Sequence, residues 1–200
     1  MIEYIIAMLV LLNPFAMFLY LQPVMKALSK KEFLKVLTKA TIISLSIFTI
    51  FLLTRELFFE ALFNIRFESF QIFGGIVLFS MAYYFIVRGE KALIILKEDL
   101  EDLANDIALP FMVGAGTISL TIIMSETHNF FGGLTIVSIA LGVNYVLILF
   151  LQFIRNQFDK RKMRVAFDKN MEILLKLSGF FLGAIGIDMI ITGITAIGFV

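Results

Sequence analysis

Six long apolar runs, separated by short charged stretches, constrain this chain more than any other feature of its sequence. A helix needs about 20 apolar residues to cross the ~30 Å hydrocarbon core of a bilayer, and each run is close to that length. The runs are continuous rather than alternating, which favours helices over membrane β-strands. They cover residues 4–25, 36–54, 69–87, 107–124, 130–154 and 177–200.

The composition supports a membrane protein and excludes most soluble functions. Hydrophobic residues make up 60% of the 200 positions and charged residues only 16%, against about half and about a quarter in soluble domains. So few polar side chains cannot cover a water-facing globule. The near-neutral net charge of +1 gives no basic domain for nucleic acid, so none is expected as a partner. We therefore predict one all-α membrane domain over residues 1–200.

The positions of the basic residues predict the orientation in the membrane. Five, three and six of the 17 Lys and Arg residues lie near the first, third and fifth connections between the runs. The positive-inside rule places such loops in the cytoplasm. Both termini are then outside, and the cell membrane is the expected location.

The chain divides into two halves of three runs each. Residues 89–106, between the halves, carry leucines at three- and four-residue spacing with Glu and Asp between them, which predicts an amphipathic cytoplasmic linker. Three crossings in residues 1–88 bring the second half, residues 107–200, into the membrane from the opposite side. The prediction is therefore six transmembrane helices arranged as a 3+3 inverted repeat.

The first and fourth runs are interrupted at corresponding places near their middles. Asn13-Pro14 interrupts the first, and Pro110 followed by Gly114-Ala115-Gly116 interrupts the fourth. Main-chain groups freed by such breaks must face protein, water or a ligand, and paired breaks are typical of the binding site of a secondary transporter. A kink that serves helix packing alone is the alternative. The predicted substrate contacts are Asn13, Pro14, Gly114, Gly116, Thr117 and Ser119.

A few polar and small residues inside the runs have other predicted roles. Asp188 is the one acidic residue well inside a run, and a central carboxylate costs about 2.5–3.5 kcal/mol to insert. We expect Asp188 to face the interior, where it and Asn144 are candidates for proton or sodium coupling. The glycines expected to allow close helix packing are Gly74, Gly75, Gly179 and Gly183.

Enzyme, metal and cofactor chemistry finds little support in the sequence. The chain has no cysteine and a single histidine, His128, so neither thiolate nor histidine clusters can hold a metal. Neither a zinc-protease HExxH motif nor a phosphate-binding GxxxxGK motif occurs. We expect neither catalysis nor a cofactor or metal, beyond a coupling ion.

Four segments together resemble the MarC family of integral membrane proteins. They are residues 12–16 (LNPFA), 71–75 (QIFGG), 109–118 (LPFMVGAGTI) and 177–183 (LSGFFLG), which occur in the family's order and with similar spacing over nearly the whole chain. The family includes SnatA-type transporters of glycine and alanine. The chain departs from the usual pattern at Leu19 and Ala115, where the family often has proline, and at Asp188, where glutamine is more frequent.

These observations favour a secondary transporter that moves a small neutral amino acid by alternating access. Coupling to a proton or sodium gradient is assumed from the class. One rival is a channel or exporter for another small metabolite. The other is a membrane protein that acts through assembly, with the glycines packing a homo-oligomer.

Overall fold

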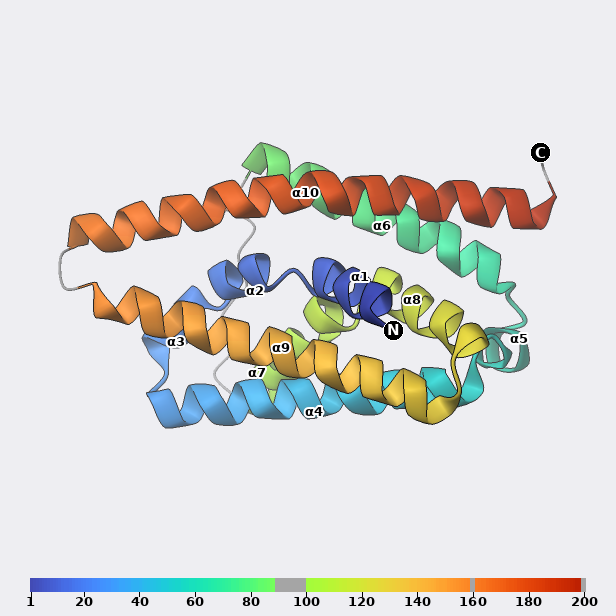
Figure 1. Ribbon diagram of the computed structural model, residues 1–200, viewed down its shortest axis with the longest axis horizontal. Coiled ribbons are helices and arrows are strands. Elements are labelled where there is room, and N and C mark those ends of the chain that lie inside the picture. The colour runs from blue at the N-terminus through green and yellow to red at the C-terminus, as the bar shows by residue number, and fades with distance from the viewer. Residues whose placement is uncertain (89–99, 159–160, 199–200) are drawn as a thin grey trace.

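The computed structural model describes residues 1–88, 100–158 and 161–198, and these residues form helices without a strand (Figure 1). The all-α prediction is confirmed for this part of the chain. The elements are α1 (Ile2–Leu12), α2 (Pro14–Tyr20), α3 (Gln22–Ala27), α4 (Lys30–Thr54), α5 (Leu57–Phe63), α6 (Phe67–Arg88), α7 (Leu100–Asp106), the π-helical turn η2 (Ile107–Met112), α8 (Ala115–Thr127), α9 (Phe130–Gln157) and α10 (Arg161–Ile197).

Five stretches in the described residues are long and apolar enough to cross a membrane. They are Ile2–Ala27, Lys30–Thr54, Phe67–Val87, Phe130–Gln157 and Lys162–Ile197. The predicted fourth run, residues 107–124, is not among them because η2 and α8 divide it into two short pieces.

Two predicted boundaries are also corrected or only partly described. The last run was expected to begin at residue 177, but α10 begins at Arg161, since hydropathy does not detect the polar end of a helix that extends beyond the bilayer. Most of the predicted linker, residues 89–106, lies outside the described residues. Its described end forms α7, with Leu103 and Ala104 buried and Asp102 exposed, as an amphipathic helix requires.

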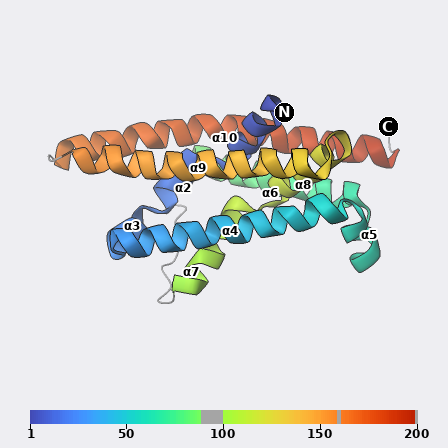
Figure 2. The same ribbon diagram turned by 60° about the horizontal axis from the view of Figure 1, so that its bottom comes forward.

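The α6–α10 pair forms one side of the bundle, and α4 with α9 forms the other (Figure 1). The interrupted segment of α1 and α2 runs between these pairs. In the turned view α7 projects from the side of α4 (Figure 2), against which it packs. The beginning of α1 and the end of α10 both lie in the right half of Figure 1.

Glycines let α6 and α10 approach until their backbones touch. A Cβ atom built on Gly186 would lie 2.7 Å from the carbonyl oxygen of Gly75, and one on Gly75 would collide with the carbonyl oxygen of Gly186. A Cβ on Gly179 would lie 3.2 Å from the carbonyl oxygen of Ala82, a looser approach, and one on Gly183 would meet only Ala82 Cβ at 3.4 Å. Such close approach allows helices to pack in lipid, where hydrophobic association is absent.

The start of α4, beside the basic residues Lys26, Lys30 and Lys31 at one end of the bundle, follows from a local signal. Ser29 Oγ accepts from the backbone N–H of Glu32, and the Glu32 carboxylate accepts from the N–H of Ser29 at 2.9 Å. This reciprocal capping satisfies two N–H groups that would otherwise lack acceptors. The sequence Ser-Lys-Lys-Glu therefore fixes where α4 begins.

Candidate functional site

The first helix break is centred on Asn13. Asn13 adopts a left-handed conformation with φ 46° and ψ 74°, and its side-chain oxygen accepts from the N–H of Ala16 at 3.2 Å. The residue before a proline avoids the helical region, and asparagine tolerates the left-handed one. Pro14 then begins α2, and because it has no N–H it cannot donate a hydrogen bond to the carbonyl of Val10. Asn13 and Pro14 thus end α1 and begin α2.

The second break extends from Leu109, inside η2, to Gly114, which precedes α8. Leu109, which precedes Pro110, leaves the helical region with φ −121° and ψ 122°. Gly114 is extended, and its N–H donates to Thr117 Oγ1 at 2.9 Å. The Thr117 hydroxyl in turn lies 3.1 Å from the carbonyl of Met112. The break therefore forms with Ala115 between the two glycines, because Gly114 and the Thr117 cap suffice.

The two breaks meet inside the bundle. A Cβ on Gly116 would lie 2.5 Å from Leu78 Cδ1 and 3.1 Å from Leu11 Cδ2, so the start of α8 packs directly on α6 and on the end of α1. A cavity of about 30 Å³ is lined by Asn13 and by Phe111 of η2, among others. That volume is enough for a water molecule but too small for an amino acid. The cavity beside the breaks therefore has no room for an amino acid in this conformation.

Asn13 also connects the first break to α10. Its side-chain nitrogen donates to Ser178 Oγ at 2.8 Å. On the other side of this contact lies an open crevice of about 330 Å³, formed by α1, α2, α9 and α10 and almost entirely apolar. Its lining residues are Ile6, Leu9, Val10, Asn13, Pro14, Phe15, Leu147, Leu174, Leu177, Ser178 and Phe181.

Two of the predicted polar residues are buried without a hydrogen-bond partner. Asn144 is 0% exposed and neither amide atom has a partner, and Ser119 is 1% exposed with its hydroxyl oxygen unpaired. Such groups are rare in native interiors and point to water, an ion or a ligand. Asn144 lies one turn before Leu147, which lines the crevice with Asn13.

Several other hydroxyl residues in the membrane helices bond to the backbone of their own helix. In α4 the hydroxyls of Thr41, Ser46 and Thr49 each donate to the carbonyl four residues earlier, which is the usual arrangement in membrane helices. Ser119 differs from them, because its buried hydroxyl has no such hydrogen bond.

The expectation that Asp188 faces the interior is wrong. Its side chain is exposed, on the side of α10 where Ile187 and Ile191 are also exposed, whereas its neighbour Met189 is buried against the bundle. One step along a helix turns a side chain by about 100°, so the close glycine contacts with α6 fix which residues face inward. Asp188 is not brought together with Asn13, Thr117 or Asn144.

Sequence reasoning missed a polar cluster at the basic end of the bundle. The carboxylate of Asp168 accepts two hydrogen bonds from Arg155, at 2.8 and 2.9 Å, and one from Gln22 at 3.0 Å. The three residues of this cluster, Gln22, Arg155 and Asp168, lie on α3, α9 and α10 and are largely shielded from solvent. The signal was hidden because Asp168 falls outside the apolar runs. Ser178 was missed for another reason, since a serine beside Gly179 resembles ordinary packing.

Within the part of the chain that the structure describes, no group of three His, Cys, Asp or Glu side chains is placed to hold a metal ion. The arrangement offers instead main-chain groups at two helix breaks and a few neutral side chains. Such groups bind small polar or zwitterionic molecules through hydrogen bonds and helix-end dipoles.

Comparison with known proteins finds membrane proteins of similar sequence. The chain is similar to UPF0056 membrane proteins of Aquifex aeolicus (27% identity over 94% of this chain and 89% of the relative), Methanocaldococcus jannaschii (27%, over 92% and 90%) and Bacillus subtilis (YvbG; 27%, over 78% and 75%). No solved structure matches it. The family described as MarC family integral membrane protein matches residues 1–197. The apolar helices and this match over almost the full length together place the chain in the MarC family of multi-pass integral membrane proteins.

Proposed function

We propose that this chain is a secondary transporter of small neutral amino acids, glycine or alanine, working by alternating access. The observation that carries the proposal is the meeting of two broken helices in the buried interior, with Leu11 of one against Gly116 of the other. Discontinuous helices that meet near the membrane midplane are the usual construction of substrate sites in secondary transporters.

The proposal includes six membrane crossings as a 3+3 inverted repeat. The segment from η2 through α8 is the fourth crossing, in two pieces, as α1 to α3 form the first. Residues 1–88 and 107–200 are then the repeats, with α6 and α10 as equivalent helices. An even number of crossings agrees with the beginning of α1 and the end of α10 lying in the same half of the bundle. Both termini are proposed to be outside the cell membrane.

The chemistry of a zwitterion suits the groups at the breaks. The first N–H groups of α8, at Ala115 and Gly116, have no acceptor within their helix, and the helix dipole favours a carboxylate there. The carbonyl of Val10, which Pro14 cannot serve, is an acceptor for the ammonium group. Asn13, Thr117 and Ser119 add side-chain hydrogen bonds close to the same breaks.

The small volume of the cavity beside the breaks, about 30 Å³, explains why transport needs a conformational change. An amino acid enters only when the two halves separate around Asn13. The Asn13–Ser178, Gln22–Asp168 and Thr38–Tyr145 hydrogen bonds are among the polar contacts between the first half and the second. In this mechanism they break and re-form as the site opens to one side of the membrane.

Coupling to a proton or sodium gradient completes the proposal. Asn144 is the candidate in the interior, because its unpaired amide can bind an ion through its oxygen. Asp188 remains a candidate only if the exposed face of α10 contacts water or the ion during transport. Substitution Asp188→Asn tests this: unchanged gradient dependence of uptake removes Asp188 from the mechanism.

Uptake into proteoliposomes tests the function. Labelled glycine and alanine are offered with imposed proton or sodium gradients, and leucine serves as the oversized control. We expect saturable uptake of the two small amino acids. Thr117→Val should abolish it, whereas Thr135→Val, at an exposed hydroxyl of α9, should not. Absence of saturable uptake under every gradient contradicts the proposal.

The alternatives give different results in the same assay. A channel gives flux that rises linearly with concentration and ignores imposed gradients. An exporter of another metabolite leaves glycine uptake at background, and competition with a metabolite panel then identifies the substrate. A protein that acts by assembly alone gives no flux, and Thr117→Val then has no more effect than Thr135→Val.

A further inference from the structure

A groove at the basic end of the bundle has a chemistry that the transport proposal does not use. It lies between α3 and the start of α4 on one side and the end of α9 on the other, and its volume is about 650 Å³. Its lining residues are Met25, Lys30, Leu34, Leu149, Gln152, Phe153 and Asn156.

The groove changes from polar to apolar along the helix axes. Lys30 is the first residue of α4, and Leu34 lies one turn further into the bundle. On α9 the order from the helix end inward is Asn156, Gln152 and Leu149, a distance of about 10 Å at 1.5 Å per residue. Further in, the hydroxyls of Thr38 and Tyr145 meet at 3.1 Å and connect the two helices.

The charge of the groove is of one sign. Lys30 contributes a positive charge and its other lining residues are neutral. Phe153 is 60% exposed, so the groove has an apolar side that is open to the surroundings of the helices. A site for a soluble ion would not need this exposed apolar wall.

We propose that this groove binds one anionic phospholipid from the adjacent leaflet. The lipid phosphate pairs with the Lys30 ammonium, the amides of Gln152 and Asn156 donate to phosphate or ester oxygens, and an acyl chain lies on Leu149. The order of these groups matches the order of headgroup, glycerol and chain along the bilayer normal. Basic residues beside a membrane helix attract such lipids. This proposal stands whether or not the protein transports amino acids.

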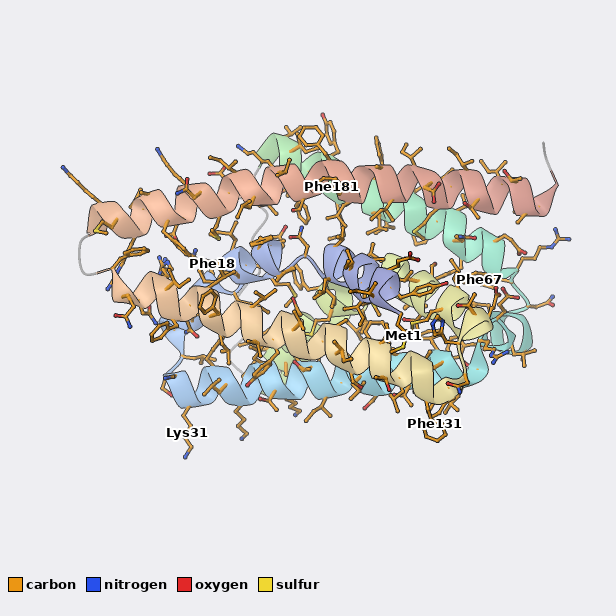
Figure 3. All side chains as sticks on the ribbon, in the orientation of Figure 1. Met1, Phe18, Lys31, Phe67, Phe131 and Phe181 are labelled. Carbon is orange, nitrogen blue, oxygen red and sulfur yellow. The ribbon has the colours of Figure 1, made fainter. Side chains whose placement is uncertain are left out.

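Native mass spectrometry of the purified full-length protein tests the proposal. The protein is mixed with phosphatidylglycerol or with phosphatidylcholine of the same chain length. We expect retained adducts of phosphatidylglycerol in excess of phosphatidylcholine, and about fivefold fewer of them in Lys30→Gln, the effect of one lysine near a lipid surface. The matched control is Lys31→Gln, which removes the same charge from a side chain that points away from the bundle (Figure 3).

Two further variants distinguish lipid binding in the groove from a general attraction of anionic lipid to the basic surface. Leu149→Trp fills the apolar floor while leaving Lys30 in place, and Asn156→Leu removes an exposed amide without risk to folding. Both variants should retain fewer phosphatidylglycerol adducts than the wild type. Soluble glycerol phosphate should not reduce the adducts of the wild type. Three results would each overturn the proposal. The first is an equal loss of phosphatidylglycerol adducts in Lys30→Gln and Lys31→Gln, and the second is equal retention of phosphatidylglycerol and phosphatidylcholine by the wild type. The third is full retention of phosphatidylglycerol in both Asn156→Leu and Leu149→Trp. Competition by glycerol phosphate would identify a free anion site instead.

Discussion

The side-chain nitrogen of Asn13 donates a hydrogen bond to the hydroxyl of Ser178, 2.8 Å away, across 165 positions of sequence. The same asparagine holds the left-handed turn between α1 and α2 and caps α2 through its oxygen. The Ser178 hydroxyl in turn donates a hydrogen bond to the carbonyl of Leu175 at 2.8 Å. One residue thus forms the first helix break and attaches it to α10, so a change at Asn13 affects both the local backbone and the contact between the two halves.

Substitution of Asn13 should separate these roles. In Asn13→Ala the protein loses the cap, worth about 1 kcal/mol, and gains left-handed strain of about 1–2 kcal/mol. Asn13→Gly loses the same hydrogen bonds without the strain, so it should unfold at a higher temperature than Asn13→Ala. Both should lose glycine uptake. Equal thermal stability of Asn13→Ala and the wild type in detergent would show that Asn13 does not hold the break.

Asn144→Leu should stabilise the protein and inactivate it. The change removes a buried amide without partners, whose burial costs about 1–3 kcal/mol, and leucine has the same branched arrangement of side-chain heavy atoms. We expect a higher unfolding temperature and no uptake. The control Asn156→Leu, at an exposed position of the same helix, should change stability by less than about 0.5 kcal/mol. A less stable Asn144→Leu would mean that Asn144 has a structural partner.

Gly75→Ala should destabilise the α6–α10 contact. The added Cβ collides with the carbonyl of Gly186 and lies 2.7 Å from Ile190 Cγ1, and overpacking of this kind costs about 1–3 kcal/mol. Gly142→Ala, with nothing within 4 Å of its Cβ, should be neutral or stabilising, because alanine favours a helix interior. Thermal unfolding of the two variants in the same detergent measures the difference. If Gly75→Ala is as stable as Gly142→Ala, the two helices are not in backbone contact.

Asp168→Asn should weaken the cluster that joins α3, α9 and α10. The amide cannot replace both charged hydrogen bonds to Arg155. A hydrogen bond to a charged group contributes about 1.5–3 kcal/mol to stability, and solvent screening reduces that contribution here. We expect a loss of about 1–3 kcal/mol in the free energy of unfolding. Lys176→Gln breaks an exposed pair with Glu172 and should cost no more than about 0.5 kcal/mol. Similar losses in both variants would contradict a special role for Asp168.

Much of the local structure could be predicted because its causes are local. Apolar length indicates the membrane helices, the Ser29–Glu32 pair predicts the start of α4, and Asn13-Pro14 predicts the first break. Other features could not be predicted. Asp188 was expected to face inward, and the rotation of α10 about its axis turns it outward. The polar beginning of α10 and its Asp168 contacts fall outside any hydropathy signal.

The sequence by itself determined the class of fold and the positions of both helix breaks, because a missing proline N–H, a left-handed asparagine and an extended glycine act within a few residues. Only the tertiary structure decided what those breaks touch. The Asn13–Ser178 bond, the contact of Leu11 with the start of α8, and the isolation of the Asn144 amide depend on how each helix is rotated against its neighbours. That rotation is set by interhelical contacts such as Gly75 against Gly186, between residues far apart in the chain.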